Sequence, residues 1–242
     1  MTVGALFLAE FIGSMVLIFL GISVVANVVL KDSKGNGSGW IVITTGWAFA
    51  VAIAAYITGG ISGAHLNPAL TISFMVIGMI TPGNAVVYII AQMLGAMAGA
   101  GLVYLMYKQH YDATEDPGSI LATFSTGPAI RNKFWNTVSE ALATAMLVFG
   151  ILGITASRNN LGPIGTYLVG VLIWSLGLSL GGPTGYAINP ARDIGPRIMH
   201  QFLPIKNKGT SDWDYAVVPI VGPVIGAIAG ALLYTACTGI WG

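Results

Sequence analysis

Long apolar stretches alternate with short polar ones along the chain, and this pattern predicts the helices. Six apolar stretches are long enough to cross a bilayer as α-helices: residues 4–30, 40–59, 84–107, 134–156, 162–181 and 215–237. Charged residues and turn formers collect at 31–39 and 108–133, which we interpret as loops. The pattern therefore predicts an all-α membrane protein with six transmembrane helices.

Two further apolar stretches are too short to cross a bilayer. Residues 67–78 and 189–203 would span only about 18–22 Å of the roughly 30 Å hydrocarbon core as helices. Non-helical backbone at that depth is tolerated only when protein buries it or when it lines a wet cavity. We therefore interpret both stretches as re-entrant half-helices that border a pore or a binding site.

The composition agrees with a chain that lies in a membrane. Of its 242 residues, 10 are Lys or Arg and 9 are Asp or Glu, a charged share of 8%, whereas soluble domains carry roughly 25%. The mean hydropathy is +0.79. A net charge of +1 provides no electrostatic footprint for nucleic acid, and the single cysteine, Cys237, provides neither a disulfide nor a cysteine metal site. The first apolar stretch lacks the flanks of a removable signal, so we expect it to stay in the protein.

Two alignments within the sequence indicate an internal repeat. Placing Glu10 on Glu140, an offset of 130, superimposes LIF on LVF. Placing Asn67 on Asn189, an offset of 122, superimposes SGAHLNPAL on TGYAINPAR. The last span of each half also carries a G-x-x-x-G pattern, at Gly95 and Gly99 and at Gly222 and Gly226, which lets helices approach closely.

The repeat predicts the topology of the chain. The halves, about 1–107 and 134–242, each contain three spans and one half-helix. An odd number of spans forces the second copy to insert in the opposite orientation. We therefore expect one domain over 1–242, built as an inverted 3+3 repeat.

Each half-helix begins with the same three residues: Asn67, Pro68 and Ala69 in the first half, and Asn189, Pro190 and Ala191 in the second. Asn is a favoured N-cap and Pro fits the first helical position, so one copy could be an ordinary helix start. Two copies at matching positions indicate a site. In an inverted repeat the two helix N-termini meet near the midplane, where their positive dipole ends and the asparagine NH₂ groups repel cations and hydronium.

The backbone before each motif cannot be helical, and we expect its carbonyls to line a polar path with hydrogen-bond acceptors. The residues concerned are Gly63, Ala64, His65 and Leu66 in the first loop and Thr184, Gly185, Ala187 and Ile188 in the second.

Both Asn-Pro-Ala motifs, the two glutamates and the six spans resemble the major intrinsic protein family over the whole chain. The resemblance implies the aquaporin fold, a homotetramer with one pore per subunit, and no cofactor or metal. It also implies a location in the plasma membrane with both termini cytoplasmic, and it makes Glu10 and Glu140 braces for the re-entrant loops.

Under that orientation Arg158 is the only Lys or Arg in a cytoplasmic loop. Because the positive-inside rule predicts the reverse, the orientation rests on the resemblance.

The positions at which the halves differ point to the solute. Arg192 aligns with Leu70, and Tyr186 aligns with Ala64. The resemblance places a selectivity filter at Trp47, Gly177, Tyr186 and Arg192. Water-selective members resemble one another in carrying His and Phe where this chain has Gly177 and Trp47, so we expect the absent side chain at Gly177 to widen the filter. The resemblance implies the glycerol facilitator branch, of bacterial type, with Asp193 as a further marker.

Tyr186 leaves the solute open, because glycerol facilitators commonly have Phe at this position. Its hydroxyl makes water, dihydroxyacetone, urea or undissociated lactic acid alternative solutes.

A secondary transporter is disfavoured because Glu10 and Glu140 are the only ionisable residues within the spans. An enzyme is not predicted, because no nucleophile, base and orienting group share a site, and the histidines His65, His110 and His200 lack metal-ligand spacing.

Overall fold

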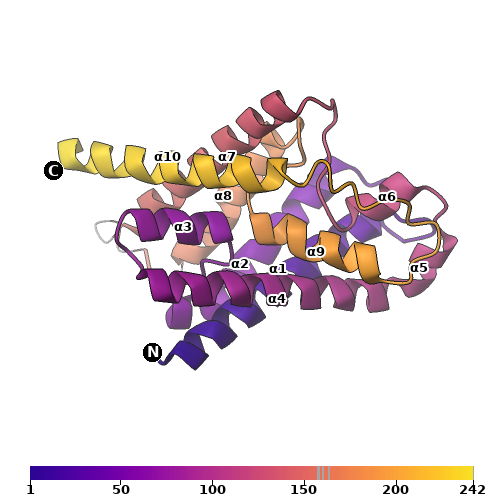
Figure 1. The fold of residues 1–242 in the computed structure, drawn as a ribbon, viewed down its shortest axis with the longest axis horizontal. Coiled ribbons are helices and arrows are strands. Elements are labelled where there is room, and N and C mark those ends of the chain that lie inside the picture. The colour runs from indigo at the N-terminus through magenta and orange to yellow at the C-terminus, as the bar shows by residue number, and fades with distance from the viewer. Residues whose placement is uncertain (157–158, 160, 163, 242) are drawn as a thin grey trace.

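A computed structural model describes residues 1–156, 159, 161–162 and 164–241, and all regular secondary structure in this part is helical. Arg158, which entered the charge count above, lies outside the described residues. The helices, drawn in Figure 1, are α1 (Val3–Val29), α2 (Trp40–Ser62), α3 (Pro68–Val76), α4 (Pro82–Met106), α5 (Lys108–Ala113), α6 (Pro117–Ala122), α7 (Lys133–Thr155), α8 (Ile164–Leu180), α9 (Pro190–Phe202) and α10 (Val218–Trp241).

Six of these helices correspond to the six predicted spans. Within the described residues, α1, α2, α4, α7 and α10 are long and apolar enough to cross a membrane. The sixth, α8, is apolar but has only 17 residues, at the lower limit of what can span a bilayer. It ends before Gly181-Gly182-Pro183, a run of residues that does not continue a helix. The half-helices α3 and α9 also form where they were predicted.

The segment 108–133, which we predicted as loop, contains the short helices α5 and α6. That expectation was wrong, for α6 because capping starts a helix even where the sequence is polar, whereas α5 follows directly on α4 without a side-chain cap. The Asp116 carboxylate accepts hydrogen bonds from the Ser119 N–H at 2.8 Å and the Ser119 hydroxyl at 2.7 Å, and Pro117 occupies the first turn of α6. The Ser119 hydroxyl is also the main reason that the pKa of Asp116 lies below its usual range.

The long helices form two close pairs, with the half-helices between them. Helix α4 packs on α1, and α10 packs on α7. In Figure 1 α3 and α9 lie roughly end to end between α4 and α10. Helix α3 of the first half contacts α10 of the second, while α9 of the second half contacts α4 of the first. Each half-helix is therefore held partly by the other half of the chain.

Glycines set the short distance within each pair, as the G-x-x-x-G spacing predicted. A Cβ atom on Gly95 would lie 2.2 Å from the Phe11 carbonyl oxygen on α1. On the second pair, a Cβ atom on Gly226 would lie 2.0 Å from the Ala141 carbonyl oxygen on α7. Any side chain at these positions would force the helix backbones apart.

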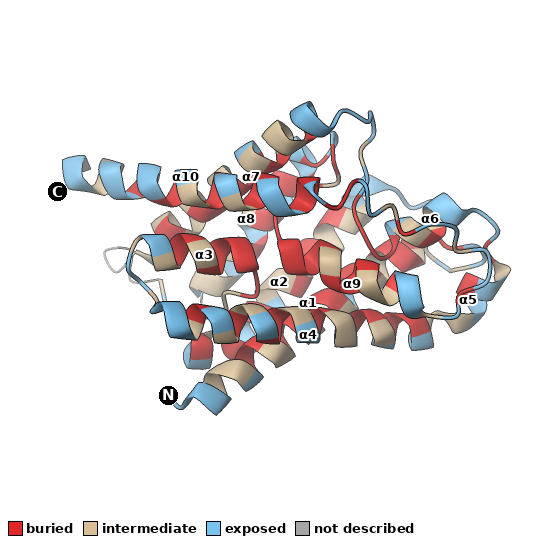
Figure 2. Ribbon diagram, in the orientation of Figure 1, coloured by how far each residue is buried: buried red, intermediate tan, exposed pale blue. Residues whose placement is uncertain are grey.

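Burial follows the expected pattern for a membrane channel or transporter. Figure 2 shows buried positions gathered toward the centre of the bundle, including most of α3 and the start of α9. Many large apolar side chains on the spans are exposed instead, among them Phe49, Leu105 and Ile225, which suits contact with lipid. Both termini lie at the end of the bundle opposite α5 and α6 (Figure 1).

We predict that Gly226→Ala destabilises the folded protein by about 1–3 kcal/mol, the range for inserting a methyl group into a packed interface. Gly239→Ala is the matched control, because it lies on the same helix and a Cβ there has no neighbour within 4 Å. Thermal unfolding in detergent should show a lower midpoint for Gly226→Ala and an equal or higher one for Gly239→Ala, since Ala favours the helix. Equal midpoints for the two variants would contradict this account of the α7–α10 contact.

Candidate functional site

The two asparagines begin the half-helices and bind the two halves of the chain to each other. Asn67 Oδ1 accepts a hydrogen bond from the Ala69 N–H at 2.9 Å, and Asn189 Oδ1 accepts one from the Ala191 N–H at 3.0 Å. Each side-chain amide also donates across the repeat: Asn67 Nδ2 to the Ile188 carbonyl and Asn189 Nδ2 to the Leu66 carbonyl, both at 2.8 Å. One N–H of each NH₂ group is used in this way, and the other can serve a solute.

Two buried glutamates hold the non-helical segments before these motifs. Glu10 accepts hydrogen bonds from the backbone N–H groups of His65 at 2.9 Å and Leu66 at 2.8 Å, and from the side chains of Ser62 and Gln92. The geometry therefore matches the bracing role expected for Glu10.

The second glutamate repeats this arrangement. Glu140 accepts from the N–H groups of Ala187 at 2.9 Å and Ile188 at 2.8 Å, and from the Thr184 hydroxyl at 2.6 Å. Thr184 was expected to line the path with its carbonyl. It is instead buried beside Glu140 and is not among the cavity-lining residues described below, because its side chain turns back to this carboxylate.

The same segments carry left-handed backbone at residues other than glycine. Ala64 and Leu66 each have φ of 50°, Tyr186 has φ of 38° and Ile188 has φ of 45°. Such conformations cost on the order of 1 kcal/mol or more each and persist where the surroundings enforce them. The N–H groups of Leu66 and Ile188 are among those bound by the glutamates, so the carboxylates stabilise the strained backbone directly.

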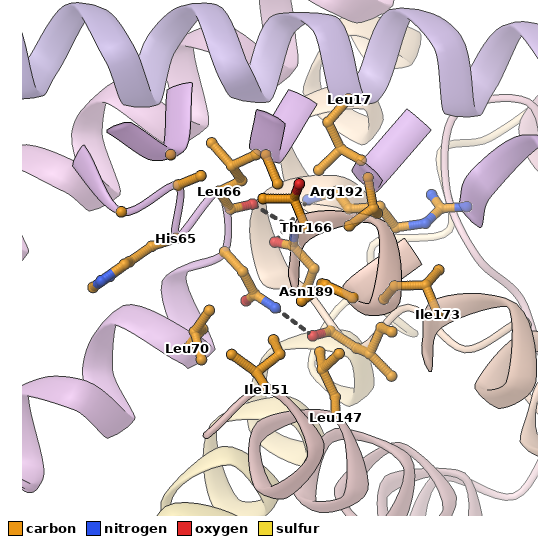
Figure 3. Close-up of a pocket in the computed structure, with 18 of the residues that line it drawn as sticks. Leu17, His65, Leu66, Leu70, Leu147, Ile151, Thr166, Ile173, Asn189 and Arg192 are labelled. Carbon is orange, nitrogen blue, oxygen red and sulfur yellow. Dashed lines mark hydrogen bonds between the residues drawn. The ribbon is translucent and has the colours of Figure 1, made fainter. Parts of the chain in front are cut away.

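A cavity of about 430 Å³ runs past both asparagines. Figure 3 shows Asn189 near its middle, the Arg192 guanidinium toward one end and the His65 ring toward the other. Apolar side chains form much of the wall, including Leu17, Leu147 and Ile173. Of the predicted site residues, those on the wall are Trp47, Gly63, Ala64, His65, Leu66, Asn67, Gly185, Tyr186, Ala187, Ile188, Asn189 and Arg192. The remaining motif residues, Pro68, Ala69, Pro190 and Ala191, are buried in the first turns of α3 and α9.

Arg192 is buried and held from two sides. Its guanidinium carbon lies 4.4 Å from the centre of the Trp47 ring, a cation–π distance. Its Nη1 atom donates to the Phe124 carbonyl at 3.5 Å. The structure thus brings Trp47, Tyr186 and Arg192 of the predicted filter together on one cavity.

Gly177 does not widen the cavity as we predicted. A Cβ atom on Gly177 would lie 2.8 Å from both Cζ and Oη of Tyr186, so the Tyr186 ring occupies the space that the glycine leaves. Gly177 itself is not on the cavity wall; its carbonyl accepts from Trp40 Nε1 at 3.0 Å. The Tyr186 hydroxyl is buried and has no hydrogen-bond partner among the described residues.

His65 contacts residues of α3 and α4 through its ring. Its Nδ1 atom lies 3.1 Å from the Thr71 hydroxyl, and its ring packs edge to face against Phe74 and Tyr88. No group of three or more His, Cys, Asp or Glu side chains that could hold a metal occurs in the described part of the chain.

Sequence reasoning missed several polar residues that support the site. Gln92 donates to Glu10, and Arg197 pairs with Asp193 at 2.8 Å. The repeat alignment, which places Asp193 opposite Thr71, was a usable signal, because a buried acid requires a partner. No comparable signal marks Gln92, whose role depends on where α4 packs.

We predict that Asn189→Asp weakens the junction between the halves, because a carboxylate oxygen replaces the donor facing the Leu66 carbonyl. The loss should be about 1–3 kcal/mol of folding stability, accompanied by entry of monovalent cations, since a negative charge now lies between two helix N-termini. Asn132→Asp is the control: Asn132 also caps a helix through its side-chain oxygen, but at an exposed position. Thermal unfolding and sodium flux into vesicles would test this, and equal behaviour of the two variants would refute it.

Comparisons with known proteins agree with this geometry. The profile of the family described as major intrinsic protein matches residues 2–234. The chain is 56% identical to the probable glycerol uptake facilitator protein of Thermotoga maritima, over 95% of this chain and 98% of that one. It is 53% identical to the glycerol uptake facilitator protein of Bacillus subtilis, over 95% and 84%. Its fold matches the X-ray structure of the aquaglyceroporin from Plasmodium falciparum with a TM-score of 0.87 at 30% identity, over 99% of both chains. The chain therefore belongs to the major intrinsic protein family and is a multi-pass membrane protein.

Proposed function

We propose that this protein is a passive channel for glycerol and other small neutral solutes, with some water. The observation that carries the proposal is the cavity wall at Trp47, Tyr186 and Arg192, where two aromatic rings lie with a single guanidinium. A polyol has C–H groups along one edge and hydroxyls along the other. The rings suit the first edge, and the Arg192 donors suit the second.

The remainder of the path can exchange hydrogen bonds with the solute. The unused N–H groups of Asn67 and Asn189 donate at the middle of the cavity, and the non-helical backbone before each motif supplies acceptors along its wall. A solute that gives up hydrogen bonds to water on entry therefore replaces them one at a time with bonds to the wall. The free-energy barriers along the path stay low for this reason.

Ions are excluded by the same arrangement. The N-termini of α3 and α9 both begin at the cavity, and each contributes roughly half a positive charge. Arg192 adds a full charge beside them. Monovalent cations and hydronium would therefore face repulsion, and no carboxylate side chain among the described residues of the wall opposes it. Glu10 and Glu140 are buried behind the backbone that they bind.

This arrangement supports conduction rather than catalysis or coupled transport, so we infer that the protein is not an enzyme and has no resident cofactor or metal. We also infer that the chain forms a single domain of two inverted halves, about 1–107 and 134–242. By its membership of the family, we place it in the plasma membrane as a homotetramer with cytoplasmic termini.

The proposal predicts that Gly177→Ala reduces glycerol permeability roughly tenfold, equivalent to ~1.4 kcal/mol of barrier. The added methyl group must push the Tyr186 ring away from Gly177, and because this ring lines the cavity the slot should narrow. Water, being smaller, should be affected less. The control is Gly182→Ala, where a Cβ has nothing within 4 Å.

Stopped-flow light scattering on reconstituted vesicles under an inward glycerol gradient measures both permeabilities in one trace. Rapid reswelling of wild-type vesicles supports the proposal. If the vesicles shrink rapidly but reswell no faster than empty vesicles, the protein conducts water and not glycerol, and the proposal is wrong. If Gly177→Ala left the ratio of glycerol to water permeability unchanged, the filter would not be where we place it.

The solutes inferred from the Tyr186 hydroxyl can be tested separately. Because Oη is buried over Gly177, we predict that Tyr186→Phe leaves the relative permeabilities of glycerol, urea, dihydroxyacetone and undissociated lactic acid within about twofold of wild type, as is usual when a removed group contacts no solute. Uptake of radiolabelled solutes into vesicles measures these ratios. A selective loss of lactic acid uptake would return the hydroxy acid alternative to first place.

A further inference from the structure

The half-helix α9 carries a buried ion pair that the proposed pore does not use. Arg197 Nε donates to Asp193 Oδ1 at 2.8 Å, and both side chains are 0% exposed. In the repeat alignment these positions correspond to Thr71 and Met75, so α3 has no such pair. A buried ion pair is weak evidence for stability, because well-packed apolar residues often serve as well. Its presence in α9 but not in α3 therefore points to a task specific to the second half of the chain.

Arg197 joins α9 to two loop segments. Its Nη1 atom donates to the carbonyls of Ser211 at 2.7 Å and Asp212 at 2.9 Å, and its Nη2 atom donates to the Thr126 carbonyl at 3.2 Å. A planar guanidinium can make these bonds together because its donors point in fixed directions. One side chain thus fixes the segments around 126 and 211 relative to the half-helix.

Asp193 holds the first of these segments a second time. Its Oδ2 atom accepts hydrogen bonds from the Thr126 N–H at 2.7 Å and the Thr126 hydroxyl at 2.8 Å. The backbone N–H, hydroxyl and carbonyl of Thr126 are all bound by this pair. Two residues earlier, the Phe124 carbonyl accepts the hydrogen bond from Arg192.

We propose that Asp193 and Arg197 are positioning residues for the filter: they hold the segment 124–126 so that the Phe124 carbonyl fixes the Arg192 guanidinium over Trp47. The inference rests on the proposed function, because it treats Arg192 as the polar side of the solute slot. An arginine side chain has many rotamers, and two contacts determine this one, the Trp47 ring and the Phe124 carbonyl. The pair controls the second contact without touching the solute.

The surroundings should let the segment stay folded when the pair is broken. The Phe124 ring is buried and packs against Tyr111 and His200, so its side chain remains anchored. The Thr126 carbonyl, in contrast, would lose its bond to Arg197, and Asp193, which holds the Thr126 N–H and hydroxyl, would lose the cation that fixes it. We therefore expect the Phe124 carbonyl to reorient locally and the Arg192 guanidinium to become mobile. The solute slot would then be wider and less selective.

The test uses Arg197→Met in full-length protein, alone and combined with Arg192→Val. The first readout is the ratio of erythritol to glycerol permeability in vesicles, because a four-carbon polyol reports on slot width. Arg197→Met should raise this ratio about threefold or more, within the range of coupling between residues of one network. In the Arg192→Val background it should have no further effect, because the residue that it positions is absent.

Two further variants keep the test decisive. Asp193→Asn preserves side-chain shape but removes the charge and places an NH₂ group near the Thr126 N–H, so it should give the same change if Arg197→Met does not fold. Lys208→Met is the control: Lys208 donates to the carbonyls of His200, Gln201 and Leu203 at the end of α9. It should leave the ratio unchanged.

Hydrogen exchange separates this inference from the proposed function. In Asp193→Asn the amide of Thr126, whose hydrogen bond Asp193 accepts, should exchange faster while the amide of Ser119, bound by Asp116, should not, whatever solute the channel passes. Unchanged exchange at Thr126, an unchanged permeability ratio, or an equal change with and without Arg192 would each overturn the proposal. Wild-type vesicles that exclude glycerol would refute the proposed function instead, and the exchange result would then decide whether the pair holds the segment.

Discussion

Glu10 and Glu140 each accept hydrogen bonds from two consecutive backbone N–H groups, at a depth where no bulk water can replace a lost partner. Helices satisfy their own backbone, but the segments 63–66 and 183–188 cannot, and a cavity wall made of backbone requires such segments. A carboxylate offers up to about four acceptor sites in one small group. It is therefore well suited to bind several N–H groups that point the same way, and the carbonyls remain available for the cavity.

The arrangement of the halves follows from the same requirement. A half-helix whose N-terminus lies inside the protein needs partners for that N-terminus. Here the two N-termini lie next to each other, because Asn67 and Asn189 each donate a hydrogen bond to the loop before the other half-helix. Neither half could form this junction alone. The glycine contacts of α4 on α1 and of α10 on α7 bring the long helices close enough to enclose it.

The sequence predicted those parts of the molecule that depend on local spacing. Apolar length located the spans, and Asn followed by Pro located the starts of α3 and α9, because capping involves residues two or three positions apart. The repeat paired the two glutamates with each other, and only the resemblance to the family connected them to the loops. The prediction that Gly177 widens the filter was wrong. The space above a glycine depends on which side chain of another segment enters it, and here Tyr186 does. The bonds of Arg197 to the segments around 126 and 211 were missed for a similar reason: loop paths are not periodic, so no pattern reports them.

The fit of Tyr186 over Gly177 also bears on how such proteins change over evolutionary time. A side chain added at 177 would clash with the phenol ring, and removing the ring first would leave a void beside Trp40, whose indole packs against it. Adding a side chain at 177 alone, or removing the ring at 186 alone, thus leads through a poorly packed intermediate. A lineage moving between wide and narrow filters would have to alter both residues nearly together, so the two positions should be inherited as a unit even though 8 residues separate them along the chain.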